Sequence, residues 1–392
     1  MDSSTGGQST RAIHASTTRD GLGAPHLPIY NTTTFTFQNT AALLDVVEGR
    51  TKGSLYSRLG LNPNVVALEE TMASIEGVEK ALAFSSGMAA ITALFAAYGR
   101  SGIVCIGDAY GGTLELLTDQ LPLLGISAHF LLGSEIERLE GLLESGTRLV
   151  FFETPTNPRL EIFDVAKLSA LAHSFGALVA IDNTFASPVN QLPHALGADI
   201  VLYSATKSLG GHSDVTGGLL LGDAELIDPI WPWRKNFGTS IAPEPAALLS
   251  RSLRTLAVRV NAQTVSAQAI ADELESDRRV TRVFYPGLKS FPGHELASAQ
   301  MSGFGGMLTI EVAGDAHAAA QVVDRLSIFS LAPSLGGVES LVSQPTATSH
   351  HGLSAEELGR RGITDSMIRL SVGLEDTVDL IADLTHALDA MR

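Results

Sequence analysis

The sequence has little of several residue types that would each indicate a class of protein. It has one cysteine, Cys105, in 392 residues, which excludes an intramolecular disulfide framework and a zinc or iron–sulfur site built from several cysteines. Lys and Arg number 26 against 42 Asp and Glu, and the formal net charge of −16 disfavours nucleic acids and anionic membranes as partners. The first ten residues, MDSSTGGQST, hold no apolar segment behind a basic stretch. We therefore expect no signal peptide and a cytoplasmic location.

One uncharged segment needs a test as a membrane span. Between Lys80 and Arg100 lie 19 residues without a charge, which is nearly enough to cross a bilayer. The middle of this window, SSGM at 85–88, is a polar turn that divides it into a short apolar run and an alanine-rich helical pattern. A strand, a turn and a helix explain the window better than a transmembrane helix does.

Apolar residues are plentiful, at 45% of the chain, and the length predicts two domains of unequal size. The apolar runs lack polar alternation, as strands covered on both faces do, and helical patterns separate most of them. This repetition predicts an α/β fold with a mostly parallel central sheet between helices, whose ligand site lies at the carboxyl ends of the strands. The runs are at 81–84, 103–107, 128–132, 148–153, 177–182, 199–204 and 218–222.

Changes in composition and in hydrophobic pattern along the chain predict three parts. Residues 1–60 are an arm with a polar tail at 1–10 and little helical or strand period, expected to lie on the protein's own body or on a neighbouring subunit. Residues 61–244 form the α/β domain. Residues 245–392 begin with a connecting pair of helices and continue as a smaller α+β domain.

The sequence SATKSLGGHSD at 204–214 is the strongest candidate for chemistry, because it directly follows an expected strand. Lys207 therefore stands just past a carboxyl end, among hydroxyl groups and glycines. Partial desolvation there lowers a lysine pKa and makes the amine a nucleophile. By position alone, a surface-loop lysine is an equally good reading.

Three other strand ends supply groups that complement such an amine. Gly87 and Met88 open a helix behind Ser86, where free backbone N–H groups attract an anion. Asp182 ends one apolar run and Asn157 follows another. Separately, these are an ordinary N-cap, a turn aspartate and a proline-rich turn. Together they form the set that pyridoxal phosphate (PLP) requires: an amine, a carboxylate for the ring nitrogen and a phosphate site.

Over nearly its whole length the sequence resembles the Cys/Met-metabolism family of PLP-dependent enzymes, which includes cystathionine γ-synthases, cystathionine γ-lyases, methionine γ-lyases and O-acylhomoserine sulfhydrylases. The resemblance implies the aminotransferase-like PLP fold type I with a smaller C-terminal α+β domain. The motifs that carry it are LPIYNTTTF (27–35), YSR (56–58), NPNVVALE (62–69), FSSGMAA (84–90), DAYGGT (108–113), ETPTNP (153–158), IDNTFASP (181–188), SATKSLGGHSD (204–214), SLGGVESL (334–341) and RLSVGLE (369–375).

The family motifs imply roles for individual residues of this chain. Lys207 is the Schiff-base lysine and moves protons, Asp182 keeps the ring nitrogen protonated, and Tyr110 stacks on the ring and exchanges a proton with the substrate. The remaining cofactor contacts are Asn157 near the ring oxygen, with Gly87, Met88, Ser204 and Thr206 at the phosphate.

The family further implies an assembly in which two subunits share each site. Tyr56 and Arg58 reach the phosphate of the neighbouring subunit, and Tyr56 also faces the substrate. The expected oligomer is a homotetramer built from close dimers. Substrate-binding roles fall to Ser334 and Arg369, which grip the α-carboxylate, and to Glu339.

The implied reaction is elimination or replacement at Cγ of a sulfur-containing or O-acylated amino acid, with elimination at Cβ as a further option. Glu339 matches the cystathionine γ-lyase and γ-synthase pattern, whereas Leu55 and Glu115 stand where those enzymes often carry an acidic residue and an arginine. Gly112 stands where methionine γ-lyases typically have a cysteine. Methionine γ-lyase and O-acylhomoserine sulfhydrylase activities stay as alternatives, and the choice between lyase and synthase stays open.

The sequence disfavours two other kinds of site, that of a serine acyl hydrolase and that of a metal ion. Ser204 and Lys207 satisfy the S-x-x-K pattern of serine acyl hydrolases, but the accompanying S-D-N and K-T-G motifs do not occur in the sequence. We expect no metal site, because His350 and His351 are adjacent and cannot face one site from a regular element.

Overall fold

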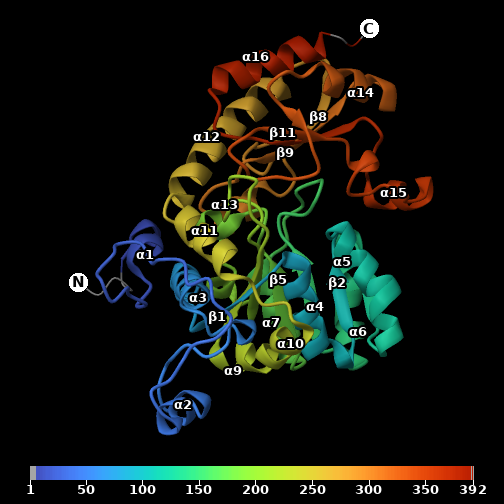
Figure 1. Cartoon of the computed structure of the whole chain (residues 1–392). Helices are drawn as coiled ribbons and strands as arrows, with labels where there is room; N and C mark the ends of the chain where they lie inside the picture. The colour runs from blue at the N-terminus through green and yellow to red at the C-terminus, as the bar shows by residue number, and fades with distance from the viewer. Residues whose placement is uncertain (1–5, 390, 392) are drawn as a thin grey trace.

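The computed structural model describes residues 6–389 and 391, which form two β-sheets and the helices around them (Figure 1). The larger sheet has seven strands in the spatial order β1 (Lys80–Phe84), β7 (Gly218–Gly222), β6 (Ile200–Ser204), β5 (Leu178–Asp182), β4 (Leu149–Glu153), β2 (Ile103–Ile106) and β3 (Ala128–Leu131). Strand β7 runs antiparallel to both of its neighbours, and the other pairings are parallel. The predicted, mostly parallel sheet is confirmed.

One of the seven predicted strands differs in its environment. Strand β3 lies at the edge of the larger sheet, and its His129 and Phe130 are exposed. The expectation that all seven strands are covered on both faces is therefore wrong for β3. A short apolar run does not distinguish an edge strand from a central one, because the neighbours along the sheet decide its cover.

The smaller sheet comes from the C-terminal part of the chain. Its five strands stand in the order β10 (Ser330–Leu331), β11 (Leu341–Ser343), β12 (Met367–Ser371), β9 (Met307–Val312) and β8 (Val280–Phe284). Strands β8 and β11 were not predicted from the sequence. Strand β8 carries exposed Thr281 and Arg282 at its centre, and β11 has only three residues, so neither forms a continuous apolar run.

Helices cover both faces of the larger sheet and one face of the smaller one (Figure 1). Helices α11 (Pro243–Leu253) and α12 (Leu256–Glu275) lie where the sequence predicts a connecting pair, and α12 extends from one sheet to the other (Figure 1). The remaining helices are α1 (Gln8–His14), α2 (Thr40–Val47), α3 (Pro63–Glu76), α4 (Gly87–Tyr98), α5 (Gly111–Glu115), α6 (Leu139–Glu144), α7 (Val165–Ser174), α8 (Ser187–Asn190), α9 (Ala224–Ile227), α10 (Trp231–Phe237), α13 (His294–Gln300), α14 (Ala316–Arg325), α15 (Ala355–Arg361) and α16 (Thr377–Leu388).

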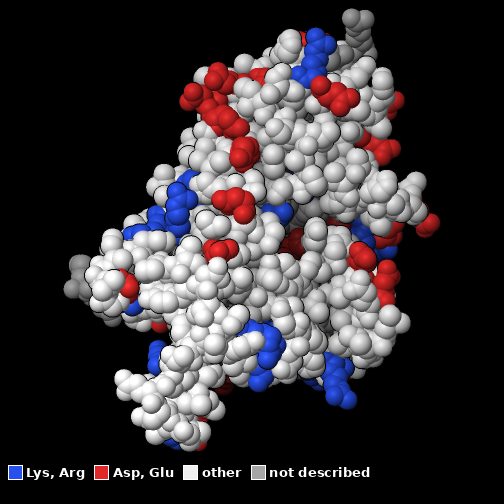
Figure 2. Space-filling view, in the orientation of Figure 1, with Lys and Arg blue, Asp and Glu red and all other residues white. Residues whose placement is uncertain are grey.

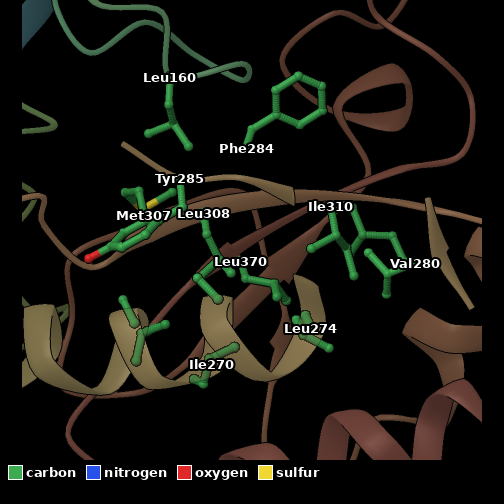
Figure 3. Packing of buried hydrophobic residues seen from close by; sticks show 14 of the residues in the cluster. Leu160, Ile270, Leu274, Val280, Phe284, Tyr285, Met307, Leu308, Ile310 and Leu370 are labelled. Carbon is green, nitrogen blue, oxygen red and sulfur yellow. The ribbon is translucent and has the colours of Figure 1, made fainter. Parts of the chain in front are cut away.

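Each sheet has its own apolar core. In the larger sheet, Phe95 of α4 meets Phe151 of β4 edge to face, with ring centroids 5.2 Å apart. In the smaller sheet, Ile270 and Leu274 of α12 face Leu308 of β9 and its neighbours (Figure 3). Burying one such side chain contributes about 1.5–3 kcal/mol, so α12 is held firmly against the smaller sheet.

The N-terminal arm contains two helices that the sequence pattern did not reveal. Helix α1 begins inside the predicted polar tail, whose residues 1–5 lie outside the described residues. Helix α2 is capped by Asn39, which accepts from Ala42 N at 2.9 Å, and it projects from the body with Leu44 and Val47 exposed (Figure 1). The boundaries after residues 60 and 244 stay predictions.

Two surface properties bear on possible partners. Among the described residues, no helix is long and apolar enough to cross a membrane. On the face shown in Figure 2, acidic side chains gather over α12 and α16, and basic side chains form separate small groups, one of them at the end of α16. In this view acidic and uncharged surface separates the basic groups from one another.

Candidate functional site

A cavity of about 550 Å³ lies at the carboxyl ends of β4, β5 and β6, between the two sheets. These ends contribute Glu153, Asp182 and Ser204 to its lining. The site therefore lies where the fold class predicted it. The predicted residues that line it are Gly87, Met88, Tyr110, Asn157, Asp182, Ser204, Thr206, Lys207, Ser334 and Arg369.

Lys207 lies in the tight turn that follows β6. Its backbone N–H donates to the carbonyl of Ser204 at 3.2 Å, and its carbonyl accepts from Gly211 N at 2.8 Å. The side chain extends into the cavity, where Nζ donates to Ser334 Oγ at 3.2 Å. Burial, together with the nearby charge of Arg369, lowers the lysine pKa. The amine is thus more easily deprotonated than a surface lysine, as a nucleophile and base requires.

Arg369 enters the cavity from β12 of the smaller sheet. Its Nη1 donates to Asn157 Oδ1 at 3.0 Å and its Nη2 to the carbonyl of Ser334 at 3.3 Å. Burial lowers its pKa to about 10, so the guanidinium is still charged at neutral pH. Both of these hydrogen-bond acceptors are uncharged oxygen atoms, one of a side-chain amide and one of a backbone carbonyl. A buried guanidinium of this kind is suited to binding a carboxylate from outside, with two parallel hydrogen bonds.

Two carboxyl groups lie side by side at the ends of β4 and β5. Glu153 and Asp182 are register neighbours on the two parallel strands. Asp182 Oδ1 accepts from Thr184 N at 3.0 Å, and burial raises the pKa of Asp182 to about 6. Glu153 accepts from Tyr110 N at 2.6 Å, while burial and the adjacent Asp182 raise the pKa of Glu153 well above its usual value. Asp182 is thus the carboxyl group that ionises more readily.

Glu153 was not among the predicted site residues. The sequence signal for it was its place at the end of an apolar run, the same signal that marked Asp182. Its role is structural as well as electrostatic, because its hydrogen bond to Tyr110 N ties the loop after β2 to the end of β4.

Glu153→Gln is expected to gain stability relative to the wild type as the pH is raised. Because the folded-state pKa of Glu153 lies above 4.5, the folded wild type binds more protons than the unfolded chain, and its stability falls as the pH rises above about 4.5. Glutamine does not titrate and still accepts from Tyr110 N. Glu153→Ala leaves that N–H unpaired and should cost about 1–3 kcal/mol.

Urea titrations at several pH values, without added cofactor, measure these free energies of unfolding. A Glu153→Gln variant whose stability follows the wild type in parallel across the pH range would contradict a neutral, buried Glu153.

The N-terminus of α4 forms a cradle beside Ser204. Ser86 caps the helix by accepting from Ala89 N at 3.1 Å, which leaves the first N–H groups, those of Gly87 and Met88, without helical partners. A Cβ on Gly87 would lie 3.0 Å from Ser204 Cβ, so a larger residue would crowd this space. Thr206 Oγ1, which accepts from Gly217 N at 3.1 Å, also faces the cavity. Free N–H groups and hydroxyls at a helix N-terminus suit a phosphate.

Three predicted site residues do not line this cavity. Arg58 and Tyr56 are exposed on the arm, with the Arg58 guanidinium 5.7 Å from the centre of the Tyr56 ring, and Arg58 Nη1 donates to the carbonyl of Lys235 at 2.8 Å. Glu339 accepts from Ser213 Oγ at 3.0 Å outside the cavity.

The arrangement also bears on the serine acyl hydrolase alternative. A serine nucleophile of the S-x-x-K type needs its hydroxyl within reach of the lysine amine. In the described residues, Lys207 Nζ donates to Ser334 rather than to Ser204. The cavity thus presents the lysine itself as the reactive group.

The chain is similar to known enzymes along nearly its whole length. The family described as Cys/Met metabolism PLP-dependent enzyme matches residues 9–389. A cystathionine beta-lyase of Lactococcus lactis subsp. cremoris (strain MG1363) is 43% identical over 383 residues, covering 97% of this chain and 98% of the relative. The chloroplastic cystathionine gamma-synthase 1 of Nicotiana tabacum is 42% identical over 387 residues, covering 97% and 71%.

A solved structure agrees with the architecture described above. The cystathionine gamma-lyase from Lactobacillus plantarum, in complex with L-serine, superposes with a TM-score of 0.91 at 36% identity, covering 98% of this chain and 99% of that one. The α/β fold expected from the sequence is confirmed. These relatives are named for three different reactions at similar identities, so the similarity establishes the family and its cofactor rather than the substrate.

Proposed function

Because the chain belongs to the Cys/Met-metabolism family of PLP-dependent enzymes, we propose that it catalyses elimination or replacement at Cγ of a sulfur-containing or O-acylated amino acid. The observation that carries the proposal is the meeting of Lys207 and Arg369 in one cavity. The first is a buried amine with a lowered pKa, and the second is a buried guanidinium with neutral partners. An amino acid with its carboxylate on Arg369 places its Cα and side chain near Lys207.

The residues of the cavity fit PLP. The cradle at the N-terminus of α4 suits its phosphate, and Lys207 suits its aldehyde. Asp182 is buried and, among the described residues, forms its hydrogen bond with the uncharged Thr184 rather than an ion pair. A protonated ring nitrogen would supply the missing cation, which explains why a carboxylate is kept at this position.

The cofactor, when bound, supplies an electron sink that makes protons on carbons near the amino group acidic. Arg369 would hold the substrate carboxylate and thereby orient Cα. Lys207 would remove a proton from Cα, give that proton up to the cofactor and, neutral again, remove one from Cβ, which turns loss of the γ substituent into a β-type elimination. Tyr110, at the mouth of the cavity, would exchange a proton with the amino group or the leaving group.

Gly112, in place of the cysteine typical of methionine γ-lyases, supports the cystathionine-type reading. A Cβ at position 112 would lie 2.7 Å from Tyr110 Cε1 and 3.3 Å from Met88 Sδ. A cysteine, typical there in methionine γ-lyases, would require the Tyr110 ring to move. Methionine γ-lyase and O-acylhomoserine sulfhydrylase activities are therefore second candidates, and Cβ elimination, the reaction for which the Lactococcus relative is named, is a third.

A substrate panel tests the proposed function. It contains cystathionine, methionine, homocysteine, cysteine, O-acetylhomoserine and O-succinylhomoserine, with products scored as keto acid, ammonia and thioether. Thioether formation with a thiol acceptor indicates a synthase. Ammonia and keto acid from cystathionine indicate a lyase, and the keto acid formed distinguishes cleavage at Cγ from cleavage at Cβ. No turnover of any member by the PLP-loaded protein would overturn the proposal.

The proposal includes a homotetramer in which each site takes residues from two subunits. Its support is the position of Tyr56 and Arg58, which lie on an exposed arm and not in the cavity of their own chain. The cytoplasmic location stays a prediction from the sequence.

Arg58→Ala is expected to weaken cofactor retention through the partner subunit. A hydrogen bond from an arginine to a phosphate contributes about 1.5–3 kcal/mol, which corresponds to a roughly 10- to 100-fold rise in the Kd of PLP. Equilibrium dialysis against PLP measures the change. Arg50→Ala is the matched control, because Arg50 lies on the same arm and pairs locally with Asp45 and Glu48. Equal affinity in the Arg58 and Arg50 variants would contradict the shared site.

A further inference from the structure

A buried ionic cluster lies beside the loop that carries Tyr110. Asp108, two residues before Tyr110, is 8% exposed and accepts two bonds through its carboxylate. His350 Nε2 lies 3.0 Å from Asp108 Oδ2, and Arg361 Nη1 donates to Asp108 Oδ1. His350 is also buried, and its Nδ1 lies 2.9 Å from Ser349 Oγ. We call Asp108, His350 and Arg361 the Asp108 cluster.

The Asp108 cluster joins parts of the chain that belong to different sheets. Asp108 follows β2 of the larger sheet, whereas His350 and Arg361 lie between β11 and β12 of the smaller one. The partners are 242 and 253 residues apart in sequence. The two segments also approach each other closely at Gly111, where a Cβ would lie 2.8 Å from the carbonyl oxygen of Ser349. Glycine at 111 therefore lets the two segments touch.

The same two segments form one wall of the active-site cavity. Tyr110 lines it from the larger sheet, and Thr348 and Ser349 line it from the smaller one. The Tyr110 ring is half exposed, and in the described residues its only hydrogen bonds are made by its backbone. Its own contacts do not determine where the phenol points. The segment that carries Ser349 lies beside the next residue of this loop, Gly111, and lines the same cavity.

We propose that Asp108, His350 and Arg361 are positioning residues, which clamp the chain between β11 and β12, residues 344–361, against the Tyr110 loop and so set the place of the Tyr110 phenol in the cavity. The proposal rests on the proposed function and adds residues that touch neither substrate nor cofactor. Removing His350 leaves Asp108 with one of its two partners and frees the segment on the His350 side. A misplaced proton-transfer group slows the chemical step without removing the binding groups Arg369 and Lys207.

His350→Ala is expected to lower kcat about 10- to 100-fold, with little change in the Kd of PLP. His350→Gln should restore most of the rate, because its amide nitrogen can donate to Asp108 in place of Nε2. In a Tyr110→Phe background the same His350→Ala change should have little further effect, since the group it positions is gone. A full, multiplicative loss in both backgrounds would overturn the proposal.

Hydrogen exchange supplies a readout that does not depend on turnover. In the PLP-loaded protein, His350→Ala should speed amide exchange in both 108–114 and 344–351. Arg360→Ala is the matched control: it breaks another contact between the two parts of the chain, the half-exposed pair of Arg360 Nη2 with Glu135 Oε2 at 3.3 Å, which does not line the cavity. Unchanged exchange at 108–114 in His350→Ala would refute the clamp.

Two further outcomes distinguish a failure of the clamp from a failure of the proposed function. If the wild type turns over none of the substrate panel, the proposed function fails, and the exchange experiment still decides whether the cluster clamps the loop. If His350→Ala does not fold, Arg361→Gln makes the same test from the more exposed end of the cluster, with the same expected loss of rate and the same faster exchange. Wild-type exchange and rate in Arg361→Gln would then overturn the proposal.

Discussion

Lys207→Ala should abolish turnover while leaving the protein folded and able to hold the phosphate end of PLP. The change removes the only amine that lines the cavity from the described residues, and with it both the covalent attachment and the base for Cα and Cβ. General acid–base catalysis alone contributes about 10²- to 10⁴-fold, so the combined loss should exceed about 10⁴-fold. The cost in stability should be small, because within the described residues the Lys207 side chain gives up a single hydrogen bond, to Ser334 Oγ.

Turnover of the best panel substrate measures the loss, and borohydride trapping with peptide mapping locates the attachment. In the wild type the trapped label should map to Lys207. Lys167→Ala is the matched control, because Lys167 is an exposed lysine on α7. Full activity in Lys207→Ala, or a label on another lysine, would refute the assignment of the catalytic lysine and with it the proposed mechanism.

Asp182→Asn should lower kcat by roughly 10²- to 5 × 10³-fold, the second largest effect. Breaking a buried ion pair by neutralising one partner costs about 3–5 kcal/mol, which corresponds to that factor if the pair is needed in the transition state. Asparagine keeps the size of the side chain and can still accept from Thr184 N, so the local structure should persist. What is lost is the negative charge that would keep the ring nitrogen protonated.

Glu153→Gln is the control for this prediction, because it changes the adjacent carboxyl group to an amide and leaves Asp182 in place. Since the pKa of Glu153 is raised well above its usual value by burial and by Asp182, its neutral form prevails and the amide should retain most of the rate. Steady-state kinetics of both variants make the comparison. Equal loss in the two variants would show that the ring nitrogen does not depend on Asp182 in particular.

The reactive groups on the larger sheet could be predicted from local sequence. Lys207, Asp182 and the N-terminus of α4 all follow apolar runs, and parallel strands bring their carboxyl ends to one edge. Strand register then made Glu153 and Asp182 neighbours. The edge position of β3 could not be predicted, because it depends on the neighbouring strands and not on the segment itself. Helix α2 was missed although it had a local signal, the N-cap Asn39.

The amino-acid sequence alone was enough to identify the strands of the larger sheet, the connecting helices and, through the motifs, the family that the chain resembles, because these depend on periodicity and on residues close together along the chain. Three pairings across the sheets followed from the tertiary structure instead. Arg369 meets Asn157 across 212 residues, Lys207 meets Ser334 across 127, and Asp108 is held by His350 and Arg361. Local pattern carries no information on such pairs. Their meeting depends on how α12 and the core around Ile270 and Leu308 seat the smaller sheet against the larger one.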